Sequence, residues 1–472
     1  MSSSKPPLLE HATRDLARFA SAIQFSDLPK EVIERIKLCV LDHMGCVLFG
    51  ATLPWTQKVA ALAMAEGAAP VASISGMGKK TSIALAALVN GTSGHAFELD
   101  DMHKESIVHI GSLAPPVAFG FAEAAAGKGG KATGPDVITA MVAGYEIGAR
   151  VGNAATMGLF FRGFHPQGTS GVFAASAAAA RMLNLNAEQF QHALGMSGSQ
   201  AGGLMAAQEG AMVKRFHSGR AAQSGVYSAL LAKDGFTGIP DVLEAAYGGY
   251  LTVYSDTPNV KRLTDGLGKE WETINVGYKP HACVTSIHTA LDGLTEIMRE
   301  NNLKAGDIGK LETGLSPMTH VHCAWEYKAQ GVTAAQMNLY YGLAVTAIDG
   351  MAFTEQYKES RLKDPAIFDF ISRVSAFVDP EIEKMGPPFR HAARVRLTTK
   401  DGKVIEKFLH HRRGSPENPL KPEDVEYKFR HVVGACMSKS NIDKAVKLVA
   451  ELDKSENISA LLALMAEPVT MN

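Results

Sequence analysis

Runs of alanine and glycine at helical spacing dominate the first half of this chain and constrain its fold most strongly. The richest runs lie in six segments, at 80–98, 113–126, 135–151, 170–184, 187–200 and 219–234. Small side chains let helix axes approach one another closely, so these segments predict buried helices in a tight bundle. A further helix is predicted over 29–49, where Pro29 opens the first turn and apolar residues recur at helical spacing.

The pattern changes near residue 270, where short apolar runs begin to alternate with helical segments. Residues 393–410 have the period-2 character of two strands around Asp401-Gly402, a dipeptide that favours a two-residue type I′ hairpin turn. The helical pattern returns from Lys421 onward. The middle of the chain is therefore predicted to form a smaller α+β domain, with the C-terminal helices free to pack back onto the first domain.

Composition limits the partners of this chain. Its 472 residues include 47 Lys and Arg against 48 Asp and Glu, which gives a formal charge of -1. A chain so nearly neutral has no long-range field to attract nucleic acid or an anionic membrane, so anion binding requires a local cluster of cations. We therefore expect neither nucleic acid nor membrane as a partner.

Cysteine usage and the N-terminal sequence indicate the compartment. The five cysteines are scattered and include no CxxC pair, which argues against a disulfide framework or a zinc knuckle and fits a reducing environment. The N-terminal segment lacks the continuous apolar stretch of a signal peptide, and no run of about 20 apolar residues could cross a bilayer. The sequence predicts a cytoplasmic protein.

Four acid–base side chains crowd into the segment 98–112, namely Asp100, Asp101, His103 and His109. Histidine titrates near neutrality, so it supports proton transfer without a large pKa shift, and a nearby carboxylate can fix the orientation of its ring. Two other interpretations stay open for this segment alone. The aspartates could cap a helix beside surface histidines, or aspartate and histidine together could bind a metal ion.

A second cluster occupies the segment 163–176, in which His165 and Pro166 precede a small-residue helix that begins after Ser170. A helix start exposes free N–H groups, which could bind a carboxylate beside the histidine. A plain turn and helix cap explains the same residues equally well.

Cations gather in two further segments. The segment 209–225 holds the densest group in the helical half, and Gly219 is expected to open an Ala-rich helix there; the group consists of Lys214, Arg215, His217 and Arg220. The segment 276–288 places Lys279 and His281 at the predicted domain change, where a cation could close over a substrate. A solvated basic turn and an exposed linker are the alternative interpretations.

Taken together and in order, these clusters resemble the MmgE/PrpD family, and the resemblance extends over nearly the whole chain. The matching segments are LDHMGCVLFGA (41–51), NGTSGHAFELDDMHKESIVHIGS (90–112), GYEIGARVG (144–152), GFHPQGTSGVFAASAAAA (163–180), KRFHSGRAAQSG (214–225), YKPHACVTSIHTALD (278–292), MNLYYGLAVTAIDG (337–350) and RRGSPENPL (412–420).

This resemblance implies a fold and a class of activity. The family combines a large all-α helical domain, built from both chain ends, with an inserted smaller α+β lid domain, so the fold class is mainly α. The implied boundaries here are 1–273, 274–412 and 413–472. Family members are typically homodimers that use no metal or organic cofactor, and they include 2-methylcitrate dehydratase, cis-aconitate decarboxylase and iminodisuccinate epimerase.

The resemblance also assigns roles to residues at the boundary between the two domains. The implied catalytic residues are His109, His165, Asp101, His103 and Tyr341. The implied substrate-binding residues are Lys214, Lys279, Asp100, His217, His281 and Met102, and no metal ligand is implied. Met102 stands where the family commonly has Thr, and His281-Ala282-Cys283 replaces a common Tyr-Pro-Cys, so both departures bear on the identity of the substrate.

These residues predict a lyase that needs no cofactor and acts on a small di- or tricarboxylate. Lys214, Lys279 and the helix start after Ser170 would hold substrate carboxylates. His109 and His165 would serve as acid and base at a neighbouring carbon.

Within the same prediction, Asp101 would orient a histidine or raise its pKa. Loss of water, loss of CO₂ and epimerisation share an enolate-like intermediate, so epimerisation of an amino- or imino-dicarboxylate is the alternative activity. A metal-dependent hydrolase using Asp100, His103 and His109 ranks third, and a non-enzymatic scaffold ranks last.

Overall fold

The Ala- and Gly-rich segments form closely packed helices in the computed structural model, which describes residues 10–470. Gly219 shows why small residues matter, because a Cβ at this position would lie 2.1 Å from the carbonyl oxygen of Leu88 in a neighbouring helix. We call this assembly the helical body. Its helices before residue 260 are α1 (Ala12–Ala22), α2 (Lys30–Ala51), α3 (Pro54–Ala65), α4 (Ile83–Gly94), α5 (Ala114–Ala126), α6 (Gly134–Ala155), α7 (Gly158–Phe161), α8 (Pro166–Thr169), α9 (Gly171–Met182), α10 (Ala187–Gly198), α11 (Val213–Lys233) and α12 (Tyr250–Tyr254).

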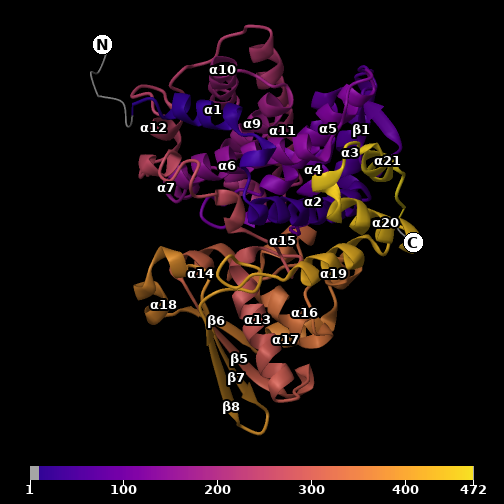
Figure 1. The fold of residues 1–472 in the computed structure, drawn as a ribbon. Coiled ribbons are helices and arrows are strands. Elements are labelled where there is room, and N and C mark those ends of the chain that lie inside the picture. Colours follow the sequence, from indigo (N-terminus) through magenta and orange to yellow (C-terminus); the bar gives the residue numbers. More distant parts are fainter. Residues whose placement is uncertain (1–9, 471–472) are drawn as a thin grey trace.

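Three C-terminal helices return to the helical body, namely α19 (Pro422–Val433), α20 (Lys439–Ala450) and α21 (Ser459–Ala466). Figure 1 shows them in yellow beside the indigo N-terminal helices, and α19 packs along α2. The main hydrophobic core accordingly takes residues from 12 to 278 and again from 420 to 465. Two short antiparallel sheets complete this body, a hairpin of β1 (Ala72–Ile74) with β2 (Lys79–Thr81), and a long-range pairing of β3 (Met102–His103) with β4 (Val276–Gly277).

The chain between β4 and α19 forms a second mass below the helical body in Figure 1, which we call the α/β body. Its four-stranded sheet has the order β6-β5-β7-β8, in which β5 and β6 are parallel and the other neighbours antiparallel. Helix α13 packs against β7 and β8. The elements are α13 (Thr285–Glu300), β5 (Ile308–Leu315), α14 (Pro317–Cys323), α15 (Val332–Met337), α16 (Leu339–Asp349), α17 (Pro365–Ile371), β6 (Val374–Val378), α18 (Pro380–Met385), β7 (Ala393–Thr399) and β8 (Val404–Leu409).

The hairpin expected around Asp401-Gly402 is present as β7 and β8, but its turn is not type I′. That type needs positive φ at both central residues, and here only Gly402 has it, at 90°. The Gly402 N–H donates to the carbonyl oxygen of Thr399 at 3.0 Å, which makes Lys400 and Asp401 the central residues of a turn that Gly402 then closes. The longer loop spares Asp401 a left-handed conformation that costs energy for a residue with a Cβ.

The fold is mainly α, as the sequence predicts. Between residues 10 and 470, no single helix is long and apolar enough to cross a membrane. Helices α2 and α3 meet that criterion only as a pair, and they are bent by 83° relative to each other.

Candidate active site

A cavity of about 60 Å³ lies between the two bodies, and five residues singled out from the sequence line it: Met102, His109, His165, Lys214 and Lys279. The β3–β4 ladder pairs Met102 with Gly277 and so brings the segment 98–112 beside Lys279. The remaining lining residues are Glu98, Ile107, Phe160, Met205, Gln208, Val284, Thr285, Ser286, Met318, His322, Met337 and His391. A wider cavity of about 340 Å³ shares Gln208, His322 and Met337 with the first, so it lies next to the buried site.

Glu98 gathers three cations at one wall of the cavity. Its carboxylate forms ion pairs with Lys214, with Arg215 at 2.5 Å and with Lys279 at 3.0 Å, and all four side chains are buried. Burial opposes ionisation of Glu98, but the three cations outweigh burial and hold its pKa well below the usual range. One negative charge facing three positive charges leaves an excess that suits an anionic ligand.

Local backbone geometry creates this cluster. Helix α11 begins at Val213, six residues before the expected start at Gly219, so Lys214 and Arg215 lie in its first turn. Gly219 lies inside the helix because of its close contact with α4. Glu98 adopts the left-handed conformation with φ of 53°, which is uncommon for a residue with a Cβ and typically persists where function requires it.

Three histidine rings stand next to one another beside this cluster. The ring centroids of His95 and His109 are 4.9 Å apart, and those of His95 and His165 are 5.9 Å apart. Asp100 lies behind them, with Oδ2 2.8 Å from His95 Nδ1 and Oδ1 3.3 Å from His109 Nδ1. Burial opposes ionisation of Asp100, yet His109 and His95 hold its pKa well below the usual range. The carboxylate is thus placed to orient both rings.

The histidines that face the cations are held neutral. Burial, together with the charge of Lys214, lowers the pKa of His165 well below its usual range, and its Nδ1 lies 2.9 Å from His217 Nδ1. Burial also lowers the pKa of His95 to about 4, against the opposing effect of Asp100. Burial lowers the pKa of Lys214 to about 8, because Glu98 compensates only in part. A neutral His165 can accept a proton from a bound molecule.

Gln167 fixes the backbone that carries His109. Its Oε1 accepts a hydrogen bond of 2.8 Å from the His109 N–H, and its Nε2 donates to the His109 carbonyl oxygen at 3.0 Å. The same Nε2 also donates to the hydroxyls of Ser112 and Ser218, each at 2.9 Å. The segment that supplies His165 therefore also holds His109 in place. The helix start after Ser170, where a substrate carboxylate was expected to bind, is not part of the cavity. The Ser170 hydroxyl forms a hydrogen bond of 2.8 Å with the Tyr250 hydroxyl in the core.

The two aspartates have separate tasks. Asp101 contacts no histidine; it accepts hydrogen bonds from the Tyr145 hydroxyl at 2.6 Å and the Gly111 N–H at 2.8 Å. The expected role of orienting a histidine therefore falls to Asp100 in this structure. Burial, reinforced by the charge of Asp42, raises the pKa of Asp101 to about 7. Asp101 supports the loop that follows His109 and does not line the cavity.

Four other residues implied by the resemblance do not line the cavity. His103 lies 3.1 Å from both the Ser106 hydroxyl and Glu272, and His281 lies 2.9 Å from Asp292. Tyr341 is buried in the core of the α/β body, where its hydroxyl donates to the Gln356 carbonyl oxygen at 2.5 Å. His217 reaches the site only through His165. Pairing with residues outside the cavity satisfies His103, His281 and Tyr341 and holds them away from it.

A metal ion could be held near the histidines, although not by the expected set. His95, Asp100 and His109 offer ligand atoms that all lie within 4.8 Å of one another. His103 is not part of this group, since Ser106 and Glu272 occupy its ring nitrogens. The same arrangement also serves as a carboxylate between two imidazoles, which needs no ion.

Sequence reasoning missed several residues of the site. Glu98 lies two residues before Asp100, and a buried carboxylate is what a dense cation cluster requires, so the cluster at 214–220 could have pointed to it. His95 and Gln167 lie within the matching segments but belong to no pattern of acid–base residues. His322 and His391 come from the α/β body, outside all of the clusters.

Comparison with known proteins gives two family matches. The MmgE/PrpD N-terminal domain matches residues 14–263, and the MmgE/PrpD C-terminal domain matches residues 281–454. This chain belongs to the MmgE/PrpD family. Together with the decarboxylase relatives described below, these matches confirm the expected enzyme class, a lyase of the MmgE/PrpD type. They also place the cavity at the junction of the two matched regions, because Glu98 and His109 lie in the first and Val284 and His391 in the second.

Several relatives of this MmgE/PrpD protein match along nearly its full length. The cis-aconitate decarboxylase-like protein oryM of Aspergillus oryzae is 31% identical over 97% of both chains. The cis-aconitate decarboxylase of Aspergillus terreus is also 31% identical, over 97% of this chain and 96% of its own. The cis-aconitate decarboxylase of Homo sapiens is 24% identical over 98% of this chain and 96% of its own.

Proposed function

We propose that this protein is a lyase that needs no cofactor, acts on a small tri- or dicarboxylate and decarboxylates a substrate of the cis-aconitate type. The observation that supports this most is the cavity in which His109 and His165 face the excess positive charge around Glu98. The names of the relatives support the choice of decarboxylation over dehydration of a 2-methylcitrate-like substrate.

The cations bind the substrate and stabilise the charge that develops on it. Lys214 and Lys279 come from the two sides of the junction and share the carboxylate of Glu98, so each keeps donors free for a ligand. A substrate carboxylate that replaces part of this pairing brings its own charge into a buried site that is already electropositive. When a C–C bond to a carboxylate breaks, the electron pair moves onto the remaining conjugated carboxylate, where the same cations stabilise it.

The histidines move the proton. Decarboxylation releases CO₂ and needs one proton delivered to carbon, and His109 is the proposed donor because it lines the cavity with its Nδ1 3.3 Å from the Asp100 carboxylate, which can orient the ring. His165, which is held neutral, is the proposed acceptor in a reaction that begins by removing a proton. Asp101 supports the loop of His109 through Gly111. We place His103, Tyr341 and His281 outside the set that touches substrate.

Epimerisation of an amino- or imino-dicarboxylate is the second candidate, because a base and an acid flanking one carbon also invert its configuration. His109 and His165 line the same cavity, with ring centroids 4.9 and 5.9 Å from that of His95, which is the observation that favours it. We further propose that the α/β body acts as a lid over the helical body. The predicted domain boundaries, a homodimer and a cytoplasmic location stay predictions.

Separate incubations with cis-aconitate, 2-methylcitrate and iminodisuccinate test this proposal. We expect cis-aconitate to give a five-carbon unsaturated dicarboxylate and an equal amount of CO₂, measured by NMR and by trapping the gas. If the protein dehydrated 2-methylcitrate and left the other two acids unchanged, it would still be a lyase, but a dehydratase and not a decarboxylase. Racemisation of iminodisuccinate alone would favour the second candidate, and turnover of none of the three would refute the proposal.

A further inference from the structure

A histidine that the mechanism does not use lines the cavity from the α/β body. His391 lies two residues before β7, only 7% of its surface is exposed, and its Nδ1 has no hydrogen-bond partner among the described residues. A buried imidazole without a partner has given up hydrogen bonds with water and gained none in return. Such an arrangement indicates that a bound ligand supplies the missing partner.

Two buried guanidinium groups stand near His391. Arg390 is 4% exposed, and its Nε has no partner. Arg412 is 1% exposed and donates from Nη1 to the Tyr278 carbonyl oxygen at 3.2 Å, while its Nε and Nη2 have no partner. Over residues 10–470, no carboxylate lies within 4 Å of Arg412. Arg390 Nη1 lies 3.7 Å from the carboxylate of Glu105, so the charge without a carboxylate partner within 4 Å on this side of the cavity is that of Arg412.

The electrostatics of this group match those of an anion site. Burial lowers the pKa of Arg412 to about 10, so its guanidinium stays charged at neutral pH. Burial also lowers the pKa of His391 well below its usual range, and the charges of Arg390, Arg412 and Lys104 lower it further. His391 is therefore neutral, with one N–H free to donate to a carboxylate.

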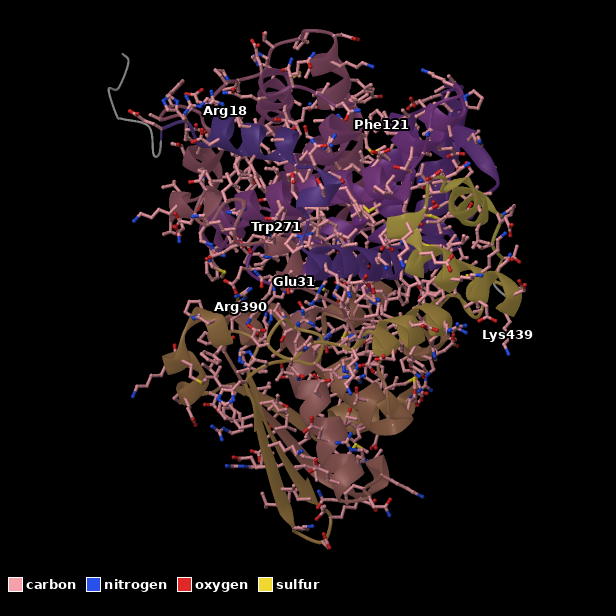
Figure 2. The ribbon with its side chains drawn as sticks, viewed as in Figure 1. Arg18, Glu31, Phe121, Trp271, Arg390 and Lys439 are labelled. Atoms are coloured by element: carbon pink, nitrogen blue, oxygen red, sulfur yellow. The ribbon has the colours of Figure 1, made fainter. Side chains whose placement is uncertain are left out.

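The backbone holds this group at the junction of the two bodies. Figure 2 shows Arg390 at the edge of the α/β body that faces the helical body. Its Nη2 donates to the Lys104 carbonyl oxygen in the helical body. Its own carbonyl oxygen accepts hydrogen bonds of 2.7 Å from the hydroxyls of Ser316 and Thr319. These contacts fix the residue next to His391 on both sides of the junction.

We propose that the cavity wall around His391 is a second anion subsite, where its imidazole donates to one substrate carboxylate and Arg390 and Arg412 stabilise the charge from behind. This rests on the proposed function and narrows its substrate class. Lys214 and Lys279, with the excess charge around Glu98, hold two carboxylates, and the subsite takes a third. The preferred substrate is therefore a tricarboxylate, and a dicarboxylate leaves the His391 subsite empty.

Binding of two inert acids tests this. Tricarballylate carries three carboxylates, and 2-methylsuccinate is the same skeleton without one terminal carboxylate. Titration calorimetry measures the Kd of each acid with the wild-type protein, His391→Leu and His391→Gln. Relative to the wild type, the Kd for tricarballylate should rise about 10–100-fold in His391→Leu, which is the range expected for loss of a hydrogen bond to a charged group. The Kd for 2-methylsuccinate should change less than about threefold, since it makes no such bond. Glutamine keeps a donor and should restore part of the loss.

His411→Leu is the matched control, because this neighbouring histidine is 30% exposed and does not line the cavity. Equal weakening of both acids in His391→Leu, or an unchanged Kd for tricarballylate, would overturn the subsite. If the leucine variant fails to fold, as judged by circular dichroism, His391→Gln decides by the same comparison of the two acids. The binding assay needs no turnover, so the two proposals can fail separately. If His391→Leu binds tricarballylate selectively more weakly but the wild-type protein turns over no substrate, the proposed function alone is refuted. If the wild-type protein turns over cis-aconitate but His391→Leu binds tricarballylate as tightly as the wild type, the subsite alone is refuted.

Discussion

Replacing Glu98 by glutamine is the perturbation whose outcome the structure fixes most closely. The variant keeps the size and polarity of the side chain but removes the carboxylate that faces Lys214, Arg215 and Lys279. Removing one partner from a buried ion pair costs about 3–5 kcal/mol, because the remaining charges stay buried without compensation. With an unfolding entropy of about 2.1 cal/mol/K per residue, a chain of 472 residues has a total of about 1 kcal/mol/K. The Tm should therefore fall by about 3–5 °C.

An added anion should reverse this loss. Tricarballylate at about 100 times its Kd stabilises a protein by about 2.7 kcal/mol, which corresponds to a rise in Tm of about 3 °C here. In Glu98→Gln, tricarballylate should raise the Tm by more than it does in the wild-type protein at the same tricarballylate concentration, because three buried cations then lack the Glu98 carboxylate as a partner. Differential scanning fluorimetry with and without tricarballylate measures both effects.

Glu326→Gln is the control for this experiment. Glu326 pairs with Lys328 at 2.9 Å, but its side chain is 77% exposed, so its replacement should change the free energy of unfolding by less than about 0.5 kcal/mol. An unchanged Tm in Glu98→Gln, or a smaller rise with tricarballylate than in the wild-type protein, would refute the assignment of Glu98 as the counter-charge of the anion site.

Three further predictions concern the histidines and the tyrosine. Burial lowers the pKa of His95 to about 4, so its contribution to stability is present above pH 6.5 and is lost as pH falls toward 4, with a loss of about 2 kcal/mol by pH 5. Denaturation of His95→Gln between pH 7.5 and 5 should therefore show a pH dependence smaller by about that amount, whereas an equal dependence would contradict it. Turnover should survive prolonged EDTA treatment, because Asp100 serves the two imidazoles as a charge partner. If EDTA abolished turnover and added Zn²⁺ restored it, a metal ion at His95, Asp100 and His109 would be established instead. Tyr341→Phe should keep kcat within about threefold, since its hydroxyl bonds to Gln356 in the core, and a fall of 100-fold or more would return Tyr341 to the catalytic set.

Much of the fold follows from local sequence. The small-residue segments indicate helices because close packing demands them, and period-2 apolar residues around Asp401-Gly402 indicate the β7–β8 hairpin. Boundaries and turn types depend on neighbours that the sequence does not reveal. Gly219 marks a close approach to α4 and not a helix start, and the hairpin has a longer loop than the dipeptide favours.

The candidate site was predictable only where residue type limits the chemistry. His109, His165, Lys214 and Lys279 meet at one cavity, as their clusters suggested. Glu98 is harder to assign in advance, because its three partners lie 116 to 181 residues away in the chain and only the need of a cation cluster for a counter-charge points to it. Asp101 and Tyr341 show the converse, since each finds a hydrogen-bond partner within the core that no motif encodes.

The decisive measurement follows cis-aconitate in D₂O by ¹H NMR with the wild-type protein, His109→Gln and His165→Gln. Because general acid–base catalysis supplies about 10²–10⁴-fold, His109→Gln should be slower by about that factor, and the wild-type product should carry one solvent deuterium on carbon. His165→Gln should be slowed less, because decarboxylation takes no proton from the substrate. A His109→Gln variant that keeps the wild-type rate, or a product without deuterium on carbon, would contradict proton donation by His109 in the cavity.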